Sequence, residues 1–214
     1  FFFFFYYLQK AIDQERKLHH QQKNFLLSVT HELKSPLASI KLYLQTILKR
    51  ELDPAQQKSF ITNSLKDIER LDDLVENMLL ATKIESNSYT FPKENFNLSE
   101  LVNSVAGRLQ IHTCSSQIIK LSVQQGIMLK GDKFALTSVV TNLIENAVKY
   151  SPPCAEVQVS LKRSNGQIQF IVADSGIGIN DQEKSRIFDK FYRVGSEDTR
   201  KTKGTGLGLF IVKQ

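Results

Sequence analysis

Residues 25–47 read FLLSVTHELKSPLASIKLYLQTI, and their apolar side chains decide the first half of the fold. These side chains recur every three or four residues, a spacing that places them along one face of an α-helix. They are Leu26, Val29, Leu33, Leu37, Ile40, Leu44 and Ile47. Pro36 has no backbone N–H to donate, so we expect it to bend the helix. The stretch predicts a long helix with one narrow apolar stripe.

A second apolar stripe follows a turn at Asp53-Pro54, where proline suits the first position of a helix. Its members are Ile61, Leu65, Ile68, Leu71, Val75, Met78 and Leu79. Two such helices make a helical hairpin, expected over residues 25–86. One hairpin buries little apolar surface, so we expect two copies to form a dimeric four-helix bundle.

His31 lies off the predicted stripe. At about 100° per residue, it is roughly 200° around the helix from Val29 and from Leu33. A helical histidine beside a glutamate is most often a solvated surface pair, and taken alone it indicates no function. We expect the imidazole to face solvent near the proline.

The sequence before this helix is unusual, because residues 1–7 are all aromatic. A bilayer span needs about 20 apolar residues, so this run is too short for a complete transmembrane helix. The aromatic run fits two origins. It is either the cytoplasmic end of an upstream transmembrane helix, with Lys10, Arg16 and Lys17 on the cytoplasmic side, or the remnant of a tag. We favour the membrane end. Residues 8–24 are polar and predict a linker helix.

Composition and net charge limit the classes of molecule that the protein is expected to bind. The 214 residues are 41% hydrophobic and 23% charged, which is typical of folded protein. The net charge of +6 permits an acidic partner, but the basic residues form no dense tract, so we expect no nucleic-acid binding. Cys114 and Cys154 have no metal-ligand spacing and predict no disulfide framework.

The pattern changes after Glu85. Polar residues 86–90 and the breaker Pro92 place a domain boundary near residue 88. Mixed periods then predict an α+β domain over residues 87–214, with helices on one face of a mixed sheet. Its expected elements are a helix opened by a capping box of Asn97 and Glu100, strands at 118–123, 127–130, 157–161 and 168–172, a hairpin turn at 164–166, and a helix at 133–149.

The helix expected at 133–149 carries the first chemical signal, in the stretch NLIENAVKYS of residues 142–151. Asn142, Asn146 and Lys149 are spaced i, i+4, i+7 and therefore share one helix face. An amide oxygen is a hard ligand suited to Mg²⁺, and an ammonium suits phosphate. By itself the pattern also fits an ordinary polar helix face.

A strand-terminal acid gives the second signal. Asp174 directly follows the strand expected at 168–172 and can accept a hydrogen bond from an exocyclic amine. Gly176 and Gly178 let the backbone approach a flat ring closely. The same short pattern also describes a common turn at the end of a strand.

A glycine-rich loop gives the third signal. Gly204, Gly206 and Gly208 alternate before an apolar helical run, as in loops whose N–H groups cradle phosphate. Residues 180–203, between the second and third signals, are charged and lack an apolar period past Tyr192, which predicts a mobile lid.

These motifs occur in one order: HELKSP at 31–36, NLIENAVKYS at 142–151, DSGIGI at 174–179, FDKFYR at 188–193 and GTGLGL at 204–209. In order and spacing they resemble the H, N, G1, F and G2 boxes of the sensor histidine kinases of two-component signalling. The resemblance covers about residues 25–214.

The resemblance implies a dimerising hairpin that carries the phospho-accepting His31, followed by an α+β sandwich of the gyrase and histidine-kinase type that binds ATP and Mg²⁺. Glu32 would accept a proton from the imidazole, and Asn146 would ligate Mg²⁺. Ser35 stands where members with strong phosphatase activity carry Thr or Asn. The other residues implied to surround the nucleotide are Asn142, Lys149, Tyr150, Asp174, Gly176, Gly178, Phe188, Arg193, Gly204, Thr205, Gly206, Leu207 and Gly208.

The resemblance also implies a reaction sequence. Mg-ATP phosphorylates His31, and the phosphoryl group passes to an aspartate in the receiver domain of a response regulator; phosphatase activity on that regulator stays open. It implies the cytoplasmic part of a bacterial inner-membrane protein, attached through an upstream transmembrane segment. The family continues past Gln214, so the ATP-binding domain is expected to be C-terminally incomplete here.

Two other readings stay open from the residues. One is a conformational ATPase of the gyrase type, which uses a glutamate where this chain has Asn142; an amide cannot act as the base that activates water. The other is a non-catalytic dimeric scaffold built on the hairpin alone.

Overall fold

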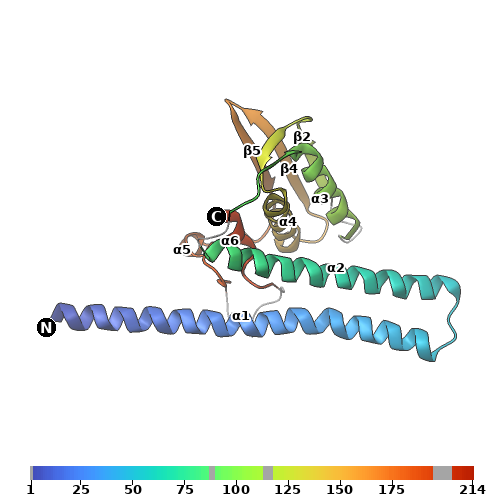
Figure 1. Ribbon diagram of the computed structural model, residues 1–214, viewed down its shortest axis with the longest axis horizontal. Helices are drawn as coiled ribbons and strands as arrows, with labels where there is room; N and C mark the ends of the chain where they lie inside the picture. The colour runs from blue at the N-terminus through green and yellow to red at the C-terminus, as the bar shows by residue number, and fades with distance from the viewer. Residues whose placement is uncertain (1, 87–89, 113–117, 195–203) are drawn as a thin grey trace. The chain divides into compact units, whose positions relative to one another are not determined.

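The computed structural model describes residues 2–86, 90–112, 118–194 and 204–214 (Figure 1). The chain divides into two compact units. The hairpin unit comprises Phe1–Leu79 and Lys190–Leu207, and the sheet unit comprises Leu80–Asp189 and Gly208–Gln214. The predicted boundary near residue 88 lies outside the described residues and stays a prediction.

Two long helices form the hairpin unit. Helix α1, Phe2–Lys49, and helix α2, Pro54–Glu85, run antiparallel beside each other, joined by a short turn (Figure 1). The predicted linker helix at 8–24 is thus part of the same helix as His31. Helix α1 continues through Pro36 without interruption. Across the described residues, no helix combines the length and apolarity that a membrane crossing requires.

Several contacts between α1 and α2 lie beside the predicted apolar stripe. Tyr43 stacks on Phe60 of α2 with ring centroids 5.4 Å apart, and Glu32 pairs with Arg70 of α2. Pro36 is buried. These three α1 positions lie within about 40° of one another on the helix. These contacts therefore lie beside the predicted stripe, of which Val29, Leu33, Ile40 and Ile47 are half-buried.

Much of the predicted stripe is exposed. Leu37 is 54% exposed and Leu44 48%, and Leu65 on α2 is 56% exposed. Other members with more than two fifths of their surface exposed are Leu26, Ile61, Ile68, Val75 and Leu79. The periodicity correctly located apolar faces, but a single chain leaves these faces largely uncovered.

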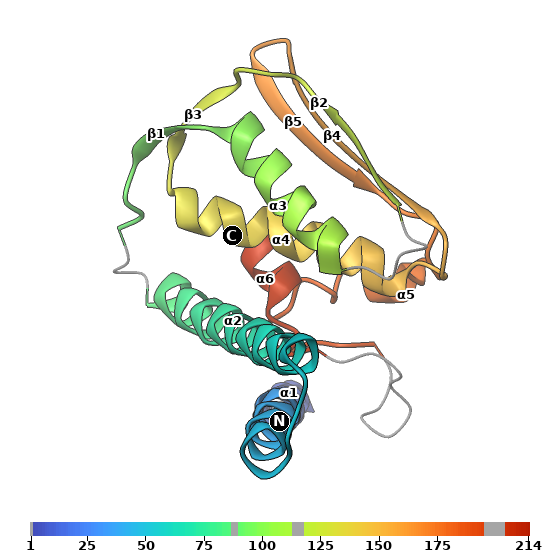
Figure 2. The same cartoon turned by 90° about the vertical axis from the view of Figure 1, so that its right-hand side faces the viewer.

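The sheet unit is the predicted α+β fold. Strands β2 (Ile118–Val123), β4 (Glu156–Ser164) and β5 (Gln167–Ala173) form a mixed sheet in the order β2-β4-β5, with β2 parallel and β5 antiparallel to β4. Helices α3 (Leu98–His112) and α4 (Lys133–Tyr150) cover one face of this sheet (Figure 2). A second, two-stranded sheet pairs β1 (Glu94–Asn97), which was not predicted, with β3 (Met128–Gly131).

Local sequence signals explain the ends of these elements. The Asn97 side chain accepts from the Glu100 backbone N–H at 3.3 Å and donates to the Glu100 carboxylate at 2.8 Å, which confirms the capping box. Asn165 and Gly166 have φ of 52° and 76°, as a two-residue type I′ hairpin turn requires. Asp132 caps α4 by accepting from the Ala135 N–H at 2.9 Å.

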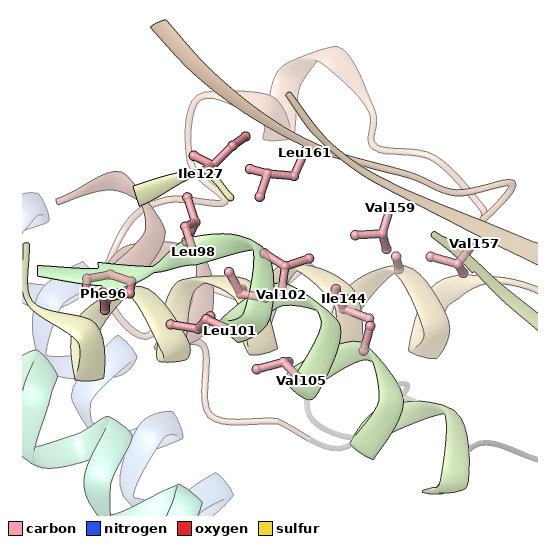
Figure 3. Close-up of a cluster of buried hydrophobic side chains, with 13 residues drawn as sticks. Phe96, Leu98, Leu101, Val102, Val105, Ile127, Ile144, Val157, Val159 and Leu161 are labelled. Carbon is pink, nitrogen blue, oxygen red and sulfur yellow. The ribbon is translucent and has the colours of Figure 1, made fainter. Parts of the chain in front are cut away.

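The core of the sheet unit lies between the helices and the sheet (Figure 3). Val157 and Val159 of β4 and Ile144 of α4 are fully buried, and Val102 of α3 completes the contact. Alternate residues of β4 point into this core, as a strand covered on one face requires. The core fixes α4, and with it the polar residues on its other faces.

Two short helices complete the sheet unit. Helix α5, Asp181–Lys184, is capped by the Asn180 side chain, and it lies in the segment that was predicted as a lid. Residues 195–203 of that segment are outside the described residues. Helix α6, Gly208–Lys213, follows the glycine-rich loop and packs on α4 (Figure 2).

Candidate functional site

Helix α4 presents the two predicted amides of the nucleotide site. Asn142 and Asn146 are both half-buried. The Asn142 amide nitrogen donates to the Ser138 backbone carbonyl at 2.9 Å and to the Ser138 hydroxyl at 3.2 Å, which fixes the orientation of its oxygen. No described residue forms a hydrogen bond with the Asn146 side chain, so its oxygen is available to a ligand.

Gly208 is the position at which the glycine-rich loop meets α4. A Cβ atom at Gly208 would lie 2.3 Å from the Asn142 Oδ1 atom and 2.9 Å from its Cγ atom. Because two hydrogen bonds already hold this amide, it cannot swing aside without losing them. Glycine at 208 therefore lets α6 begin against the amide.

The Asp174 turn is held against the C-terminal end of the same helix. Asp174 Oδ1 accepts from the Gly176 N–H at 2.8 Å, and the Ile177 N–H donates to the Tyr150 carbonyl at 3.4 Å. A Cβ atom at Gly176 would lie 2.7 Å from both Asp174 Oδ1 and the Tyr150 carbonyl oxygen. Only glycine allows this approach. The structure thus brings the Asp174 carboxylate close to the backbone carbonyl of Tyr150, and their predicted contact with nucleotide stays a prediction.

The remaining predicted contacts of the sheet unit are less enclosed. Lys149 is half-buried, with its Nζ atom 5.3 Å from the centre of the Tyr150 ring. Gly178 is exposed and adopts a φ of 69°, which favours glycine. Phe188 is half-buried.

His31 occupies a third face of α1. The imidazole is exposed. Its position is about 120° around the helix from Leu37 of the uncovered stripe and about 140° from Pro36 of the hairpin contact. The side chain therefore points away from both, and its predicted exposure off the stripe is confirmed. Ser35, one turn later, is also exposed.

Glu32, next to His31, contacts the other helix of the hairpin. Its Oε2 atom accepts a hydrogen bond from Arg70 Nη2 at 3.2 Å, and its side chain is only 10% exposed. The carboxylate predicted to take a proton from the imidazole is thus held by a residue of α2. Arg70 was not predicted.

The second half of the F box lies in the hairpin unit and contacts α1. Phe191 packs on Phe25 with ring centroids 4.0 Å apart, and Arg193 donates to the Ser28 hydroxyl at 3.1 Å. In this structure Arg193, predicted to contact nucleotide, therefore binds α1 three residues before His31.

The glycine-rich loop closes on the F box. The Phe191 N–H donates to the Gly206 carbonyl at 3.0 Å. A Cβ atom at Gly206 would lie 2.8 Å from the Phe191 carbonyl carbon, so no larger residue fits there. Gly206 also has a φ of 73°, a backbone conformation that favours glycine. Gly204 and Thr205 are half-buried, and Leu207 is buried.

Sequence reasoning missed two residues of the site. Ser138 has a local signal, because it lies four residues before Asn142 on the same helix face. Arg70 has none, because 38 residues separate it from Glu32.

Comparisons with known proteins agree with this architecture. Residues 21–87 match the family model of the His Kinase A (phospho-acceptor) domain. Residues 131–214 match the model of the Histidine kinase-, DNA gyrase B-, and HSP90-like ATPase family. Together the two matches include every residue predicted for the site.

Individual relatives span more than this chain. The sensor-like histidine kinase SenX3 of Mycolicibacterium smegmatis is 29% identical over 198 residues, covering 92% of this chain and 52% of that protein. The phosphate regulon sensor protein PhoR of Haemophilus influenzae is 32% identical over 197 residues, covering 92% and 46%. The chain thus spans about half the length of these curated relatives.

A solved structure agrees at the level of the fold. Full-length ShkA in complex with AMPPNP has a TM-score of 0.57 at 23% identity, over 90% of this chain and 40% of that one. With the two family models and the ordered motifs, the conclusion follows that the chain belongs to the sensor histidine kinases of two-component signal transduction.

Proposed function

We propose that the protein is an ATP-dependent autokinase that phosphorylates His31 and passes the phosphoryl group to an aspartate of a response regulator. The observation that carries the proposal is the placement of His31. Its imidazole is exposed on a face of α1 that neither the hairpin contact nor the uncovered stripe occupies. A group that must meet two large partners in turn needs such a face.

The sheet unit supplies the features that a nucleotide site needs. The Asp174 carboxylate, exposed at the end of β5, would accept from the amino group of adenine. The half-buried amide oxygens of Asn142 and Asn146 are hard donors of the kind that Mg²⁺ binds. When bound, Mg²⁺ would neutralise charge on the phosphates.

The chain's own residues account for the transfer. One ring nitrogen of His31 attacks the γ-phosphorus of ATP in line, and the bond from phosphorus to the β,γ-bridging oxygen breaks, releasing ADP. The proton on the other ring nitrogen passes to the Glu32 carboxylate. Asn142 cannot activate water as a carboxylate would, so transfer to His31 is favoured over hydrolysis.

The uncovered stripes indicate how the hairpin is completed. Leu37 and Leu44 of α1 and Leu65 of α2 are each about half exposed. Leucines at helical spacing on both arms of a hairpin suit a four-helix bundle, so we propose a second copy of this chain as the occupant. The proposed partners are then a second copy of this chain, which completes the homodimer, and the receiver domain of a response regulator.

Two finer features belong to the same proposal. Ser35 retains a hydroxyl that would orient water for removal of the phosphoryl group from the regulator. The exposed aromatic side chains near the start of α1, including Phe3, Phe4 and Phe5, are of the kind found at membrane interfaces, and they support the proposal that the protein acts at the cytoplasmic face of a bacterial inner membrane.

Labelling with γ-³²P-ATP tests the kinase proposal. We expect an acid-labile, base-stable phosphoprotein that is lost in His31→Gln. His20→Gln is the matched control, because His20 is also an exposed histidine of α1, and it should label like the unaltered protein. Label that persists in His31→Gln contradicts the proposal.

Nucleotide binding separates the alternatives. We expect Asn146→Ala to lose Mg-dependent ATP binding, whereas a scaffold would bind no Mg-ATP in either form. Steady phosphate release without a phosphoenzyme would identify a gyrase-type ATPase instead.

A further inference from the structure

We propose that Arg70 is the positioning residue for Glu32 in phosphorylation of His31. This inference rests on the proposed function, because it assigns a role within that reaction. Arg70 lies on α2 and Glu32 on α1, both in the hairpin unit. Arg70 therefore reaches the acid beside the phospho-acceptor from the opposite arm of the hairpin.

Among the described residues, Glu32 and Arg70 each use their side chain for one hydrogen bond, which is to the other residue. Arg70 Nη2 donates to Glu32 Oε2 at 3.2 Å. Glu32 is 10% exposed at its side chain, whereas Arg70 is 56% exposed, so the carboxylate is enclosed and the guanidinium reaches it from solvent. Within the described part of the chain, neither side chain has another hydrogen-bond partner.

The geometry orients the carboxylate without blocking it. A glutamate loses rotamer entropy when it is fixed in one conformation, so an untethered Glu32 would be spread over several rotamers. Neighbouring helix positions diverge by about 100°, so only some of these rotamers bring the carboxylate towards His31. Arg70 bonds Oε2 alone, which leaves Oε1 to accept the imidazole proton.

The guanidinium suits this role. Arginine stays cationic across the working pH range, and its hydrogen bonds to carboxylates are charge-assisted. Because the bond joins α1 to α2, the orientation of Glu32 depends on the closed hairpin. Lys66, one turn before Arg70 on α2, is exposed and has no partner among the described residues, which makes it a matched control for loss of positive charge.

Autophosphorylation kinetics of the purified protein test the proposal. We expect Arg70→Met to lower kcat about tenfold, a fraction of a full general-base contribution, with KM for ATP unchanged. Arg70→Lys should recover part of the loss, and Lys66→Met should behave like the unaltered protein. In a Glu32→Gln background, Arg70→Met should cause no further loss.

Two results overturn the assignment: unchanged kcat in Arg70→Met, or an equal loss with and without Glu32, which would mean that Arg70 acts on the phosphoryl group directly. Urea unfolding of the two single variants and the double variant tests the bond without reference to activity, and strictly additive midpoint shifts also overturn it. Absence of any phosphohistidine in the unaltered protein contradicts the proposed function instead, and the unfolding cycle still decides whether Arg70 holds Glu32.

Discussion

Apolar residues at helical spacing have opposite surroundings in the two units. Ile144 of α4 is fully buried between helices and sheet, whereas Leu65 of α2 is 56% exposed. The sheet unit therefore completes its core within one chain, and the hairpin unit does not. The same sequence pattern thus marks a core in one unit and the proposed assembly surface in the other.

The largest expected effect tests the self-contained core. Ile144→Ala removes a fully buried side chain at the centre of the sheet unit and should destabilise that unit by about 2–5 kcal/mol. Urea unfolding followed by circular dichroism measures the change. Leu65→Ala is the comparison, because it removes a similar side chain from the exposed stripe and should cost the monomer far less. Equal losses of unfolding free energy in Ile144→Ala and Leu65→Ala would contradict the distinction between the two units.

A charge in the stripe tests the assembly surface. Leu65→Glu should leave each chain folded but raise the dimer dissociation constant by roughly a hundredfold or more, because it buries an unpaired carboxylate in the bundle. Sedimentation equilibrium measures the constant. Ser59→Glu places the same side chain at an exposed position of α2, about 120° away from the stripe, and should leave the dimer intact. An unchanged dimer in Leu65→Glu would mean that another surface joins the copies.

The smallest expected effect concerns an exposed pair in the sheet unit. The Lys120 ammonium on β2 bonds the Glu156 carboxylate on β4 and, with a second bond from Gln158, lowers the pKa of Glu156. The folded state then binds fewer protons than the unfolded chain, so this pair adds stability at neutral pH and loses it as the carboxylate is protonated in acid.

Lys120→Met should therefore slightly lower the urea midpoint near neutral pH and lose this effect at a pH low enough to protonate the carboxylate in both states. Lys162→Met, at an exposed β4 position without a salt-bridge partner among the described residues, is the control. A loss of equal size at both pH values would mean that Lys120 acts through packing rather than charge.

Local chemistry made much of the sheet unit predictable. The strand at 118–123 and the turn at 164–166 depend on residues that are neighbours in sequence, and the capping box of Asn97 and Glu100 does so too. Contacts between distant segments were not predictable. Nothing in the sequence indicates that Gly208 must lie against Asn142, because the approach is set by the packing of α6 on α4.

The hairpin shows a different limit. Periodicity locates an apolar face but does not tell whether the other arm or a second chain covers it, so the contact line of Glu32, Pro36 and Tyr43 was missed. The exposure of His31 was predictable because it follows from helical phase alone. Its link to Arg70 was not, since that link exists only once the hairpin has closed.

The continuity of α1 gives His31 a mechanical connection to the start of the chain. Phe3 and His31 belong to one unbroken helix and are separated by about 42 Å of axial rise. Because the helix is continuous, a rotation of its aromatic end about the helix axis would turn the imidazole in the same direction. A rotation of about 100°, equivalent to one residue, would move His31 to the direction now occupied by a neighbouring side chain.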